Sequence, residues 1–473
     1  MYIRKVIVNK KTSQQLVNSA TLESSFRDPS GFIFKGVDGF IYRQVNKIAA
    51  KDFDLLVKSG LYKNLVDNKL LVAHKNVNDY PLLGEAYKII KPQQIPFISY
   101  PFEWSFSQLK DAALLTLNIQ KTALSYNMAL KDASAYNVQF IGGRPILIDT
   151  LSFERYQADK PWDAYRQYCQ HFLAPLLLMA NVDLSMNQMS RIFIDGIPLE
   201  LATKLLPTRV KVKPAVMMHI TMHAKAQKAK AGSAKKVEAK LPKKNLLAII
   251  DNLINVTAKL KKPVKASEWG DYYDRNNNYT EVSLKTKAEL VNDFFEGLNV
   301  KTVIDIGGNN GYFSRYLNKS GIFTVCADID PNAVEANYLL VKKHQESKML
   351  PLLVDFTNPG GGLGWANKER EIITNRLQCD GVLALAIIHH LAISNNLPLE
   401  KIAKYLKDFG KYLVIEFVPK SDSQVKKLLA TRKDIFNTYN ETDFKKAFGL
   451  YYSLIKEQRI KDTERTLFLF KSR

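Results

Sequence analysis

The C-terminal part of the chain is constrained most by a regular alternation of short apolar runs with longer helical patterns. Five runs rich in aliphatic and β-branched residues recur there: TVIDI (302–306), FTVCADI (323–329), MLPLLVDF (349–356), GVLALAII (381–388) and YLVIEFV (412–418). Each return between parallel strands needs a crossover of a dozen or more residues, usually a helix. The alternation therefore predicts an α/β fold with a doubly wound parallel sheet. We expect RTLFLFKS (465–472) to close that sheet as an edge strand.

A glycine-rich turn follows the first run, in VIDIGGNNGYFSRYL (303–317). Glycine lets the backbone approach a ligand closely, and a helix N-terminus receives anionic or polar groups. The spacing Asp-x-Gly-x-x-x-Gly differs from the G-x-G-x-x-G of dinucleotide-binding folds, and asparagine tolerates left-handed backbone at the third position of the turn. The sequence thus predicts a ligand-binding turn formed by Asp305, Gly307, Gly308, Asn309 and Gly311.

Polar side chains end the next runs as well. Asp328 ends the second run, Asp355 and Phe356 end the third, and His389 and His390 follow the fourth. A carboxylate at the end of the second strand can accept both hydroxyls of a ribose, and an Asp-Phe pair suits the amino group and ring face of adenine. Any one such Asp is commonly a turn former, but ligands of these sheets collect at the carboxyl ends of the strands. The ordered set therefore predicts a nucleoside-binding site. Glu416, at the end of the fifth run, is a further candidate for the pocket edge.

Charge divides the 473-residue chain into three parts. Of the formal charge of +22, residues 207–265 hold 15 basic and 2 acidic side chains, whereas residues 1–206 and 266–473 carry only +6 and +3. The Ala/Lys run 223–244 has few large apolar residues, which is typical of a linker or a solvated helix. We therefore expect an N-terminal α+β domain over 1–206, a basic linker or helical segment over 207–265, and a C-terminal domain over 266–473.

The sequence lacks several features that are typical of secreted and membrane proteins. The first residues lack the long apolar core of a signal peptide, and no apolar run approaches the 18 residues that would span a membrane. Three widely spaced cysteines, Cys169, Cys326 and Cys379, form neither a disulfide framework nor a zinc ligand set. We expect a cytoplasmic protein without a membrane span.

The C-terminal motifs resemble those of class I S-adenosylmethionine-dependent methyltransferases, over roughly 266–473. The resemblance implies a Rossmann-like domain in which Asp305 and the glycines hold the methionine portion of S-adenosylmethionine, Asp328 the ribose, and Asp355 with Phe356 the adenine. WGDYYDRNNNY (269–279) is similar to the segment that covers the cofactor in such enzymes, and ordinary aromatic packing is an equal alternative.

A hydroxyl or amine acceptor of a methyl group must also lose a proton. His389 and His390 are the candidates for this general base, because imidazole titrates near neutral pH. Packing or backbone hydrogen bonding of either histidine is the alternative interpretation.

The N-terminal part mixes strand and helix patterns. Residues 31–45 alternate like a β-hairpin, and residues 105–130 have a helical pattern. Residues 162–179 are too apolar for a surface helix, and we expect them in the core with His171 among them.

A second constellation lies in LKDASAYNVQFIGGRPILIDT (130–150), where Asp132 and Asn137 have an Asp-x4-Asn spacing and Asp149 follows a predicted hairpin. Phosphotransferases use such residues to orient a hydroxyl and hold Mg²⁺ on phosphates, and the segment resembles the catalytic loops of kinase-like folds. Asn137 and Asp149 would be metal ligands only if this site binds Mg²⁺ with ATP. A Gly-rich loop and a strand Lys are missing, with Arg43 near the Lys position. We interpret the N-terminal domain as kinase-like but degenerate, the alternative being that these residues only hold turns.

Both halves in this order resemble the bacterial methyltransferases named after a rhizobial host-specific nodulation protein. The segments that carry the resemblance span nearly the whole chain: DASAYNVQF, IDTLSFE, PWDAYRQYCQHFLAPL, DGIPLELATKLLP, ALAIIHHL and IEFVPKSD. The resemblance implies a cytoplasmic methyltransferase acting on a small molecule or saccharide, such as a glycolipid precursor. Two alternatives stay open. One is a nucleic-acid methyltransferase whose 207–265 segment binds phosphates, and the other is a non-catalytic interaction protein with a pseudokinase module.

Overall fold

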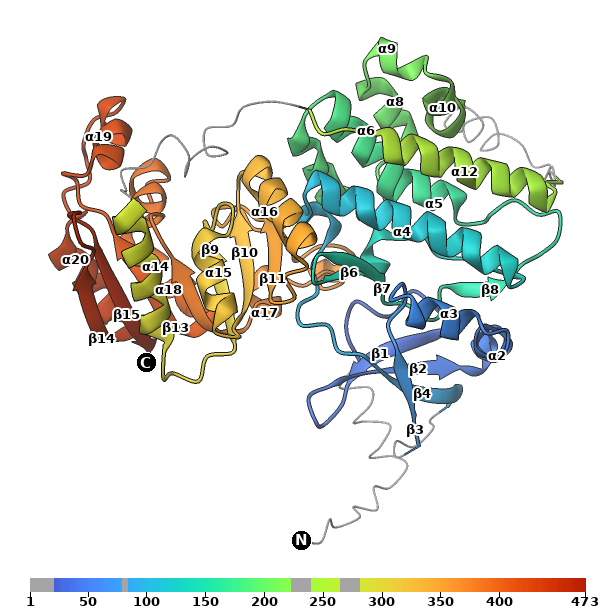
Figure 1. Cartoon of the computed structure of the whole chain (residues 1–473), viewed down its shortest axis with the longest axis horizontal. Helices are drawn as coiled ribbons and strands as arrows, with labels where there is room; N and C mark the ends of the chain where they lie inside the picture. The colour runs from blue at the N-terminus through green and yellow to red at the C-terminus, as the bar shows by residue number, and fades with distance from the viewer. Residues whose placement is uncertain (1–20, 79–83, 223–239, 264–280) are drawn as a thin grey trace, which may run out of the picture.

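The computed structural model of the chain describes residues 21–78, 84–222, 240–263 and 281–473. Figure 1 shows two parts side by side: a large sheet flanked by helices at the C-terminal end, and an N-terminal part with a small sheet below a group of helices. Within these residues, no helix combines the length and apolar character needed to cross a membrane.

The C-terminal part is built on a seven-stranded sheet with the order β11-β10-β9-β12-β13-β15-β14. Its parallel strands are β9 (Thr302–Ile306), β10 (Phe323–Asp328), β11 (Met349–Leu353), β12 (Cys379–Ala384) and β13 (Gly410–Phe417). Each coincides with one of the five predicted runs, so the predicted α/β sheet is confirmed. Successive strands are added on one side of β9 (β10, β11) and then on its other side (β12, β13). Ligands of such sheets bind at this switch point between β9 and β12.

The prediction that residues 465–472 form an edge strand is wrong. β15 (Thr466–Ser472) pairs antiparallel with both β13 and β14 (Tyr452–Arg459), and β14 is the outer strand. Four consecutive residues of β15 are buried, whereas seven of the eight residues of β14 are exposed. β14 has no alternating apolar pattern, because it packs few side chains, and it therefore gives no strand signal in the sequence.

Helices cover both faces of this sheet (Figure 1). They are α14 (Glu281–Phe295), α15 (Tyr312–Lys319), α16 (Pro331–His344), α17 (Ile373–Arg376), α18 (Leu399–Lys407), α19 (Ser423–Ala430) and α20 (Glu441–Gly449). A short π-helix, η8 (His390–Ser394), follows β12. One core cluster lies between α14, α15 and the sheet and includes Phe294, Phe313 and Leu383.

The N-terminal part begins with a four-stranded antiparallel sheet in the order β1-β2-β4-β3. The strands are β1 (Gly31–Lys35), β2 (Ile41–Asn46), β3 (His74–Val77) and β4 (Ala86–Pro92), with α2 (Ala50–Lys58) and α3 (Leu61–Asp67) between β2 and β3. β1 and β2 form the predicted hairpin. The helical lobe next to this sheet begins with α4 (Phe106–Ser125) and the short strands β5 (Met128–Leu130), β6 (Val138–Ile141), β7 (Arg144–Leu147) and β8 (Phe153–Arg155). A small antiparallel sheet next to a helical lobe is the expected α+β arrangement.

Further helices complete the helical lobe: α5 (Tyr165–Tyr168), π-helix η4 (Cys169–Leu173), α6 (Ala174–Asn181), α7 (Met189–Ile192), α8 (Leu199–Leu205), α9 (Thr208–Lys211), α10 (Pro214–Val216), π-helix η6 (Met217–Met222) and α12 (Lys243–Lys259). Every residue from His171 to Met179 is buried, which confirms the second half of the predicted core segment 162–179, whereas Asp163 and Arg166 in its first half are exposed. α12 packs on α4 through Leu246, Ile250 and Leu253, all buried. Part of the basic 207–265 stretch is therefore packed helix, while the boundary at residue 206 stays a prediction.

The N-terminal part covers β11, the outer strand at the other end of the large sheet. The side-chain amide of Gln108 donates to the backbone carbonyl of Pro351 at 3.0 Å. Ser107 donates from its N–H (2.9 Å) and its hydroxyl (2.5 Å) to the carboxylate of Glu335 on α16. Figure 1 shows α4 and β6 beside α16 and β11. These contacts join the two parts along one edge of the sheet.

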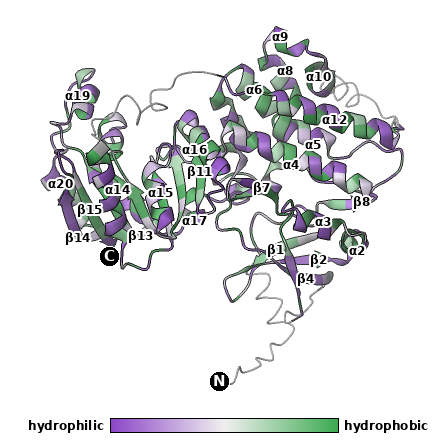
Figure 2. Ribbon diagram, in the orientation of Figure 1, coloured by the Kyte–Doolittle hydropathy of each residue, from purple (hydrophilic) through white to green (hydrophobic). Residues whose placement is uncertain are grey.

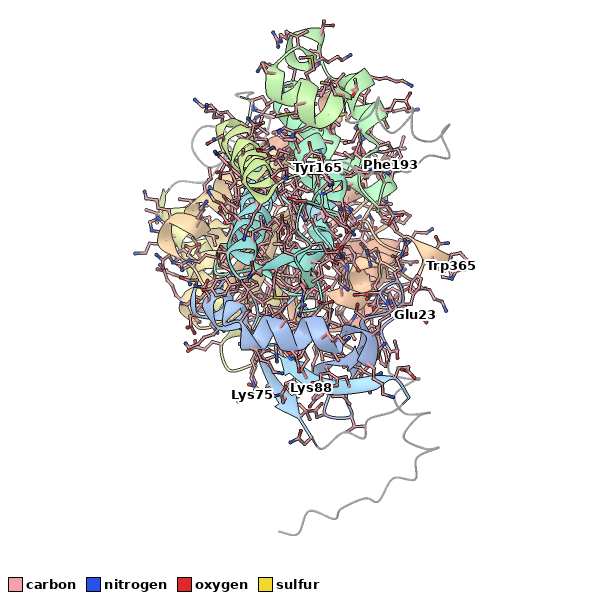
Figure 3. All side chains as sticks on the ribbon, turned by 90° about the vertical axis from the view of Figure 1, so that its right-hand side faces the viewer. Glu23, Lys75, Lys88, Tyr165, Phe193 and Trp365 are labelled. Carbon is pink, nitrogen blue, oxygen red and sulfur yellow. The ribbon has the colours of Figure 1, made fainter. Side chains whose placement is uncertain are left out.

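The segment between β11 and β12 extends this interface. Arg376 forms an ion pair with Glu103 in which the two side chains are only 6% and 2% exposed, and its guanidinium carbon lies 3.8 Å from the centre of the Tyr100 ring. Arg370 lies 4.0 Å over the ring of Tyr136, a residue of the kinase-like Asp132–Asn137 loop. Trp365, labelled at the edge of the molecule in Figure 3, is 74% exposed. The segment is thus anchored by its arginines and exposed at its tip.

Candidate functional site

The glycine-rich turn joins β9 to α15 at the switch point of the sheet, between β9 and β12. Gly307 has a φ of +75°, and a Cβ built on it would lie 2.9 Å from Cδ1 of Ile387. Both the backbone conformation and the close approach therefore require glycine at this position. Asn309 adopts the expected left-handed conformation, with φ +51°, and its N–H donates to Oδ2 of Asp328 at 2.8 Å. This bond fixes the turn against the end of β10.

Two buried carboxylates lie below and beside the turn. Asp305 is 2% exposed and accepts a hydrogen bond from the hydroxyl of Ser314 at 2.6 Å. Asp328 is 7% exposed and accepts from the N–H groups of Asn309 and Asp330, each at 2.8 Å. Burial raises the pKa of Asp305 to about 7 and that of Asp328 to about 6, and the negative charge of Asp328 adds to the shift of Asp305. Both carboxyls would be held more firmly in their ionised form by a cationic ligand.

A cavity of about 250 Å³ opens at the carboxyl ends of the strands. Six of the predicted site residues line it: Gly307, Asn309, Asp328, Asp355, Phe356 and His390. Four do not, namely Asp305, Gly308, Gly311 and His389. Gly308 packs inward, since a Cβ on it would meet Sγ of Cys326 at 2.5 Å. The candidate covering segment 269–279 lies outside the described residues.

Nine further residues line the cavity that were not predicted as site residues: Ile329, Val354, Thr357, Leu385, Ala386, Ile387, Leu391, Ser394 and Asn395. Several follow from local geometry that a sequence pattern does not reveal. Ala386 has a φ of +49°, a left-handed conformation that costs an L-residue about 1–2 kcal/mol. The π-helix η8 then directs His390 and Ser394 to the same cavity. Strained residues and π-helical turns concentrate at functional sites.

The two candidate histidines differ in position. His390 lines the cavity, whereas His389 is 2% exposed and its Nδ1 has no hydrogen-bond partner among the described residues. Burial lowers the pKa of His390 to about 4, assisted by the charge of Arg465, and it lowers the pKa of His389 well below the usual value. Both imidazoles are therefore neutral at pH 7. Of the two, His390 is the one placed to accept a proton from a molecule in the cavity.

Glu416 does not face the cavity but belongs to a buried ion network. It is 0% exposed and pairs with Lys287 of α14 at 2.6 Å and with Arg465 at 3.5 Å. Arg465 also pairs with Asp422 at 2.8 Å. This network joins α14 to the end of β13. The sequence gives no signal for it, because the partners are far apart along the chain and each residue type is usually exposed.

The N-terminal constellation is assembled but differs from a metal site. Burial, followed by the charge of Asp149, raises the pKa of Asp132, and the nearby amide of Asn137 opposes this shift, so the three predicted residues lie near one another. The side-chain amide of Asn137 donates to the hydroxyl of Ser152 at 3.3 Å. However, the guanidinium of Arg43 forms an ion pair with Oδ1 of Asp149, which also accepts the N–H of Leu151 at 2.8 Å. Across the described parts of the chain, no three His, Cys, Asp or Glu side chains are grouped to hold a metal ion. Oδ1 of Asp149 is therefore already engaged by a guanidinium and a backbone N–H.

Comparisons with known proteins agree with this geometry. A family profile described as a methyltransferase domain matches residues 278–451. The nodulation protein NoeA of Rhizobium meliloti (strain 1021) is 36% identical over 459 residues, which cover 94% of this chain and 95% of that protein. Among solved structures, similarity is found to the N-methyltransferase NodS from Bradyrhizobium japonicum WM9 (11% identity, 41% of this chain, 97% of NodS, TM-score 0.30). It is also found to the bifunctional kinase-methyltransferase WbdD (15% identity, 46% of this chain, 45% of WbdD, TM-score 0.30).

Proposed function

Because this chain belongs to the family of the nodulation protein NoeA and carries a methyltransferase domain, it is an S-adenosylmethionine-dependent methyltransferase, and we propose that it methylates a saccharide or glycolipid precursor in the cytoplasm. The bound cofactor supplies an electrophilic methyl group for direct displacement. The protein then has to orient the acceptor, exclude water and accept a proton. The observation that carries the proposal is a single cavity lined by the ends of the four successive strands β9 to β12 and by the polar first and last residues of the π-helix η8.

The described residues fit the cofactor in three places. Gly307 and Asn309 allow the main chain to approach the amino-acid portion, with Asp305, Gly308 and Gly311 supporting the turn from beneath. Asp328 would accept the ribose hydroxyls. Asp355 binds the N–H and hydroxyl of Thr357 through Oδ1 at 2.8 and 2.6 Å, while Oδ2 has no bonded partner in the described part of the chain and would accept the adenine amino group beside Phe356.

The polar side of the cavity supports a hydroxylated acceptor. His390, Ser394 and Asn395 line it together, and they offer an imidazole, a hydroxyl and an amide. Such groups can hydrogen-bond several hydroxyls of a sugar, each of which is both donor and acceptor. His390 is neutral at pH 7 and would accept the proton of the reacting hydroxyl as general base.

Calorimetric titration with S-adenosylmethionine tests the cofactor site. We expect the wild type to bind, Asp328→Ala to bind very weakly, and Asp328→Asn to retain partial binding because it still accepts the N–H of Asn309. Asp251→Asn, a carboxylate in the N-terminal helices that is 47% exposed, is the matched control. Undetectable binding by the folded wild type would refute the proposed site.

The acceptor can be found with a cofactor carrying a labelled methyl group, incubated with cell extract and separated into saccharide, lipid and nucleic-acid fractions. We expect label in a saccharide or glycolipid fraction, and His390→Gln should lower the rate about 10²–10⁴-fold while leaving cofactor affinity unchanged. Label that is released by nuclease would instead establish nucleic-acid methylation and refute the saccharide acceptor.

A further inference from the structure

Four short helices of the N-terminal part, α8 to η6, carry apolar side chains on both their buried and their exposed sides. Leu206, Val210, Val216 and Ile220 point inward and are at most 3% exposed. This inner face packs on the helical lobe and accounts for the stability of these short helices. The outer face has no such role, so its composition is free to serve another purpose.

Other large apolar side chains of the same short helices are exposed. Leu205, Val212, Met217, Met218 and Met222 are 42%, 62%, 42%, 42% and 58% exposed. Isolated exposed apolar residues are ordinary, but a gathering of them marks an interaction surface. Among the described residues, every exposed methionine lies here. Figure 2 shows hydrophobic and hydrophilic segments alternating along α8, α9 and α10 at the top of the N-terminal part.

Cations lie next to these apolar side chains along the chain. Lys204, Arg209 and Lys213 are exposed, and Lys211 is half-buried beside them. The nearest acidic side chain in the sequence, Glu200, pairs with Lys204 at 3.0 Å, and no Asp or Glu occurs from 201 to 222. We call this combination of apolar and basic side chains on α8 to η6 the methionine face.

We propose that the methionine face docks the enzyme on an anionic membrane surface. Interfacial binding combines apolar side chains that enter the headgroup boundary with cations that neutralise anionic lipids. Methionine suits such a boundary because its unbranched, flexible side chain adapts to an irregular apolar layer. Nucleic acid would use the cations but gains little from methionine, because it is held by phosphate contacts and by stacking on aromatic rings. The charge complementarity together with the exposed methionines therefore favours a lipid surface over RNA or DNA.

Co-sedimentation of the full chain with vesicles tests the proposal without cofactor or acceptor, so its outcome is independent of the acceptor proposed above. We expect binding to vesicles of phosphatidylcholine mixed with phosphatidylglycerol, and little binding to phosphatidylcholine alone. Arg209→Gln with Lys213→Gln should weaken binding about 30-fold, since each cation near such a surface contributes a factor of about five. Met217→Ser with Met218→Ser should weaken it about tenfold.

Lys47→Gln, Ile48→Ser and Lys51→Gln together provide a matched control, because they remove two exposed cations and a 71% exposed apolar residue from the opposite lobe. We expect this control to bind like the wild type, and circular dichroism should show all variants folded. Equal binding to both vesicle types, or an equal loss in the control, would refute the proposal. So would binding to an RNA oligonucleotide that is tighter than vesicle binding and unaffected by the methionine substitutions.

Discussion

Breaking the ion pair between Arg376 and Glu103 should strongly destabilise the protein. The pair joins the methyltransferase domain to the N-terminal part, and its side chains are 6% and 2% exposed. Oε2 of Glu103 accepts from Arg376 at 3.1 Å and from the N–H of Tyr100 at 2.8 Å. Arg376 also donates to the carbonyl of Ile98 at 2.8 Å. The guanidinium therefore bonds to both the carboxylate and a backbone carbonyl. Apart from Arg376, the N–H of Tyr100 is the donor that Glu103 keeps.

The expected magnitude follows from what each substitution leaves behind. Arg376→Ala leaves a buried carboxylate with a single backbone donor, and uncompensated buried charges of this kind cost about 3–5 kcal/mol. That is a large fraction of the roughly 5–15 kcal/mol by which domains are stable. Arg376→Lys keeps the charge but loses the two-pronged contact and the stacking on Tyr100, so it should cost about 1–3 kcal/mol.

Equilibrium unfolding in urea, followed by tryptophan fluorescence, measures these costs. The double variant Glu103→Gln with Arg376→Met should recover at least 1 kcal/mol relative to the sum of the single variants, because no charge stays buried. Lys63→Gln, which removes a 79% exposed partner of Asp67, is the control and should cost well under 1 kcal/mol. If Arg376→Ala costs no more than this control, or if the two single costs simply add, the reasoning is wrong.

Three further outcomes are expected. Gly307→Ala should weaken cofactor binding and lower the Tm, because its Cβ would enter the turn at 2.9 Å from Ile387, and adding Ile387→Ala should restore part of the Tm. The affinity for S-adenosylmethionine should rise with pH between 5 and 8, because the cationic cofactor favours the ionised forms of Asp328 and Asp305, whose pKa values are about 6 and about 7. The affinity of Asp305→Asn should rise less steeply with pH, and a flat wild-type profile would contradict this prediction. ATP with Mg²⁺ should leave the Tm unchanged, because a guanidinium already pairs with Asp149; a shift that disappears in Asp149→Ala would overturn this.

Local patterns in the sequence are sufficient for the parallel sheet and for six of the residues that line the cavity at the ends of its strands. The strands from β9 to β13 are apolar runs of ordinary length separated by crossover connections, so their existence and parallel direction follow from the sequence. Their pairing does not, because β9 pairs with β12, which is not the next strand along the chain. Asp328 and Asp355 follow directly, because they come at the ends of such strands. β15 shows the limit of this reasoning: its continuous burial reflects an inner position between β13 and β14, and only the partner strands reveal that position.

Other features depend on contacts between distant residues and have no local signal. The position at which the π-helix η8 begins determines which of His389 and His390 faces the cavity. The sequence pattern does not distinguish the two histidines. The pairing of Asp149 with Arg43, 106 residues away, likewise has no signal in the sequence around either residue. The pairing of Ser107 with Glu335 spans 228 residues and is equally invisible before the two parts are brought together.

The cover over β11 has a practical consequence for the methyltransferase domain. An exposed edge of a parallel sheet is a template for pairing with another chain, and proteins protect such edges with charges, prolines or neighbouring elements. Here the protection is Pro351, which lacks an N–H, together with Gln108 from the N-terminal part, which binds its carbonyl. A fragment beginning near residue 281 would lose the second of these. We expect such a fragment to be more prone to edge-to-edge aggregation than the whole chain, in which the N-terminal part lies over this edge.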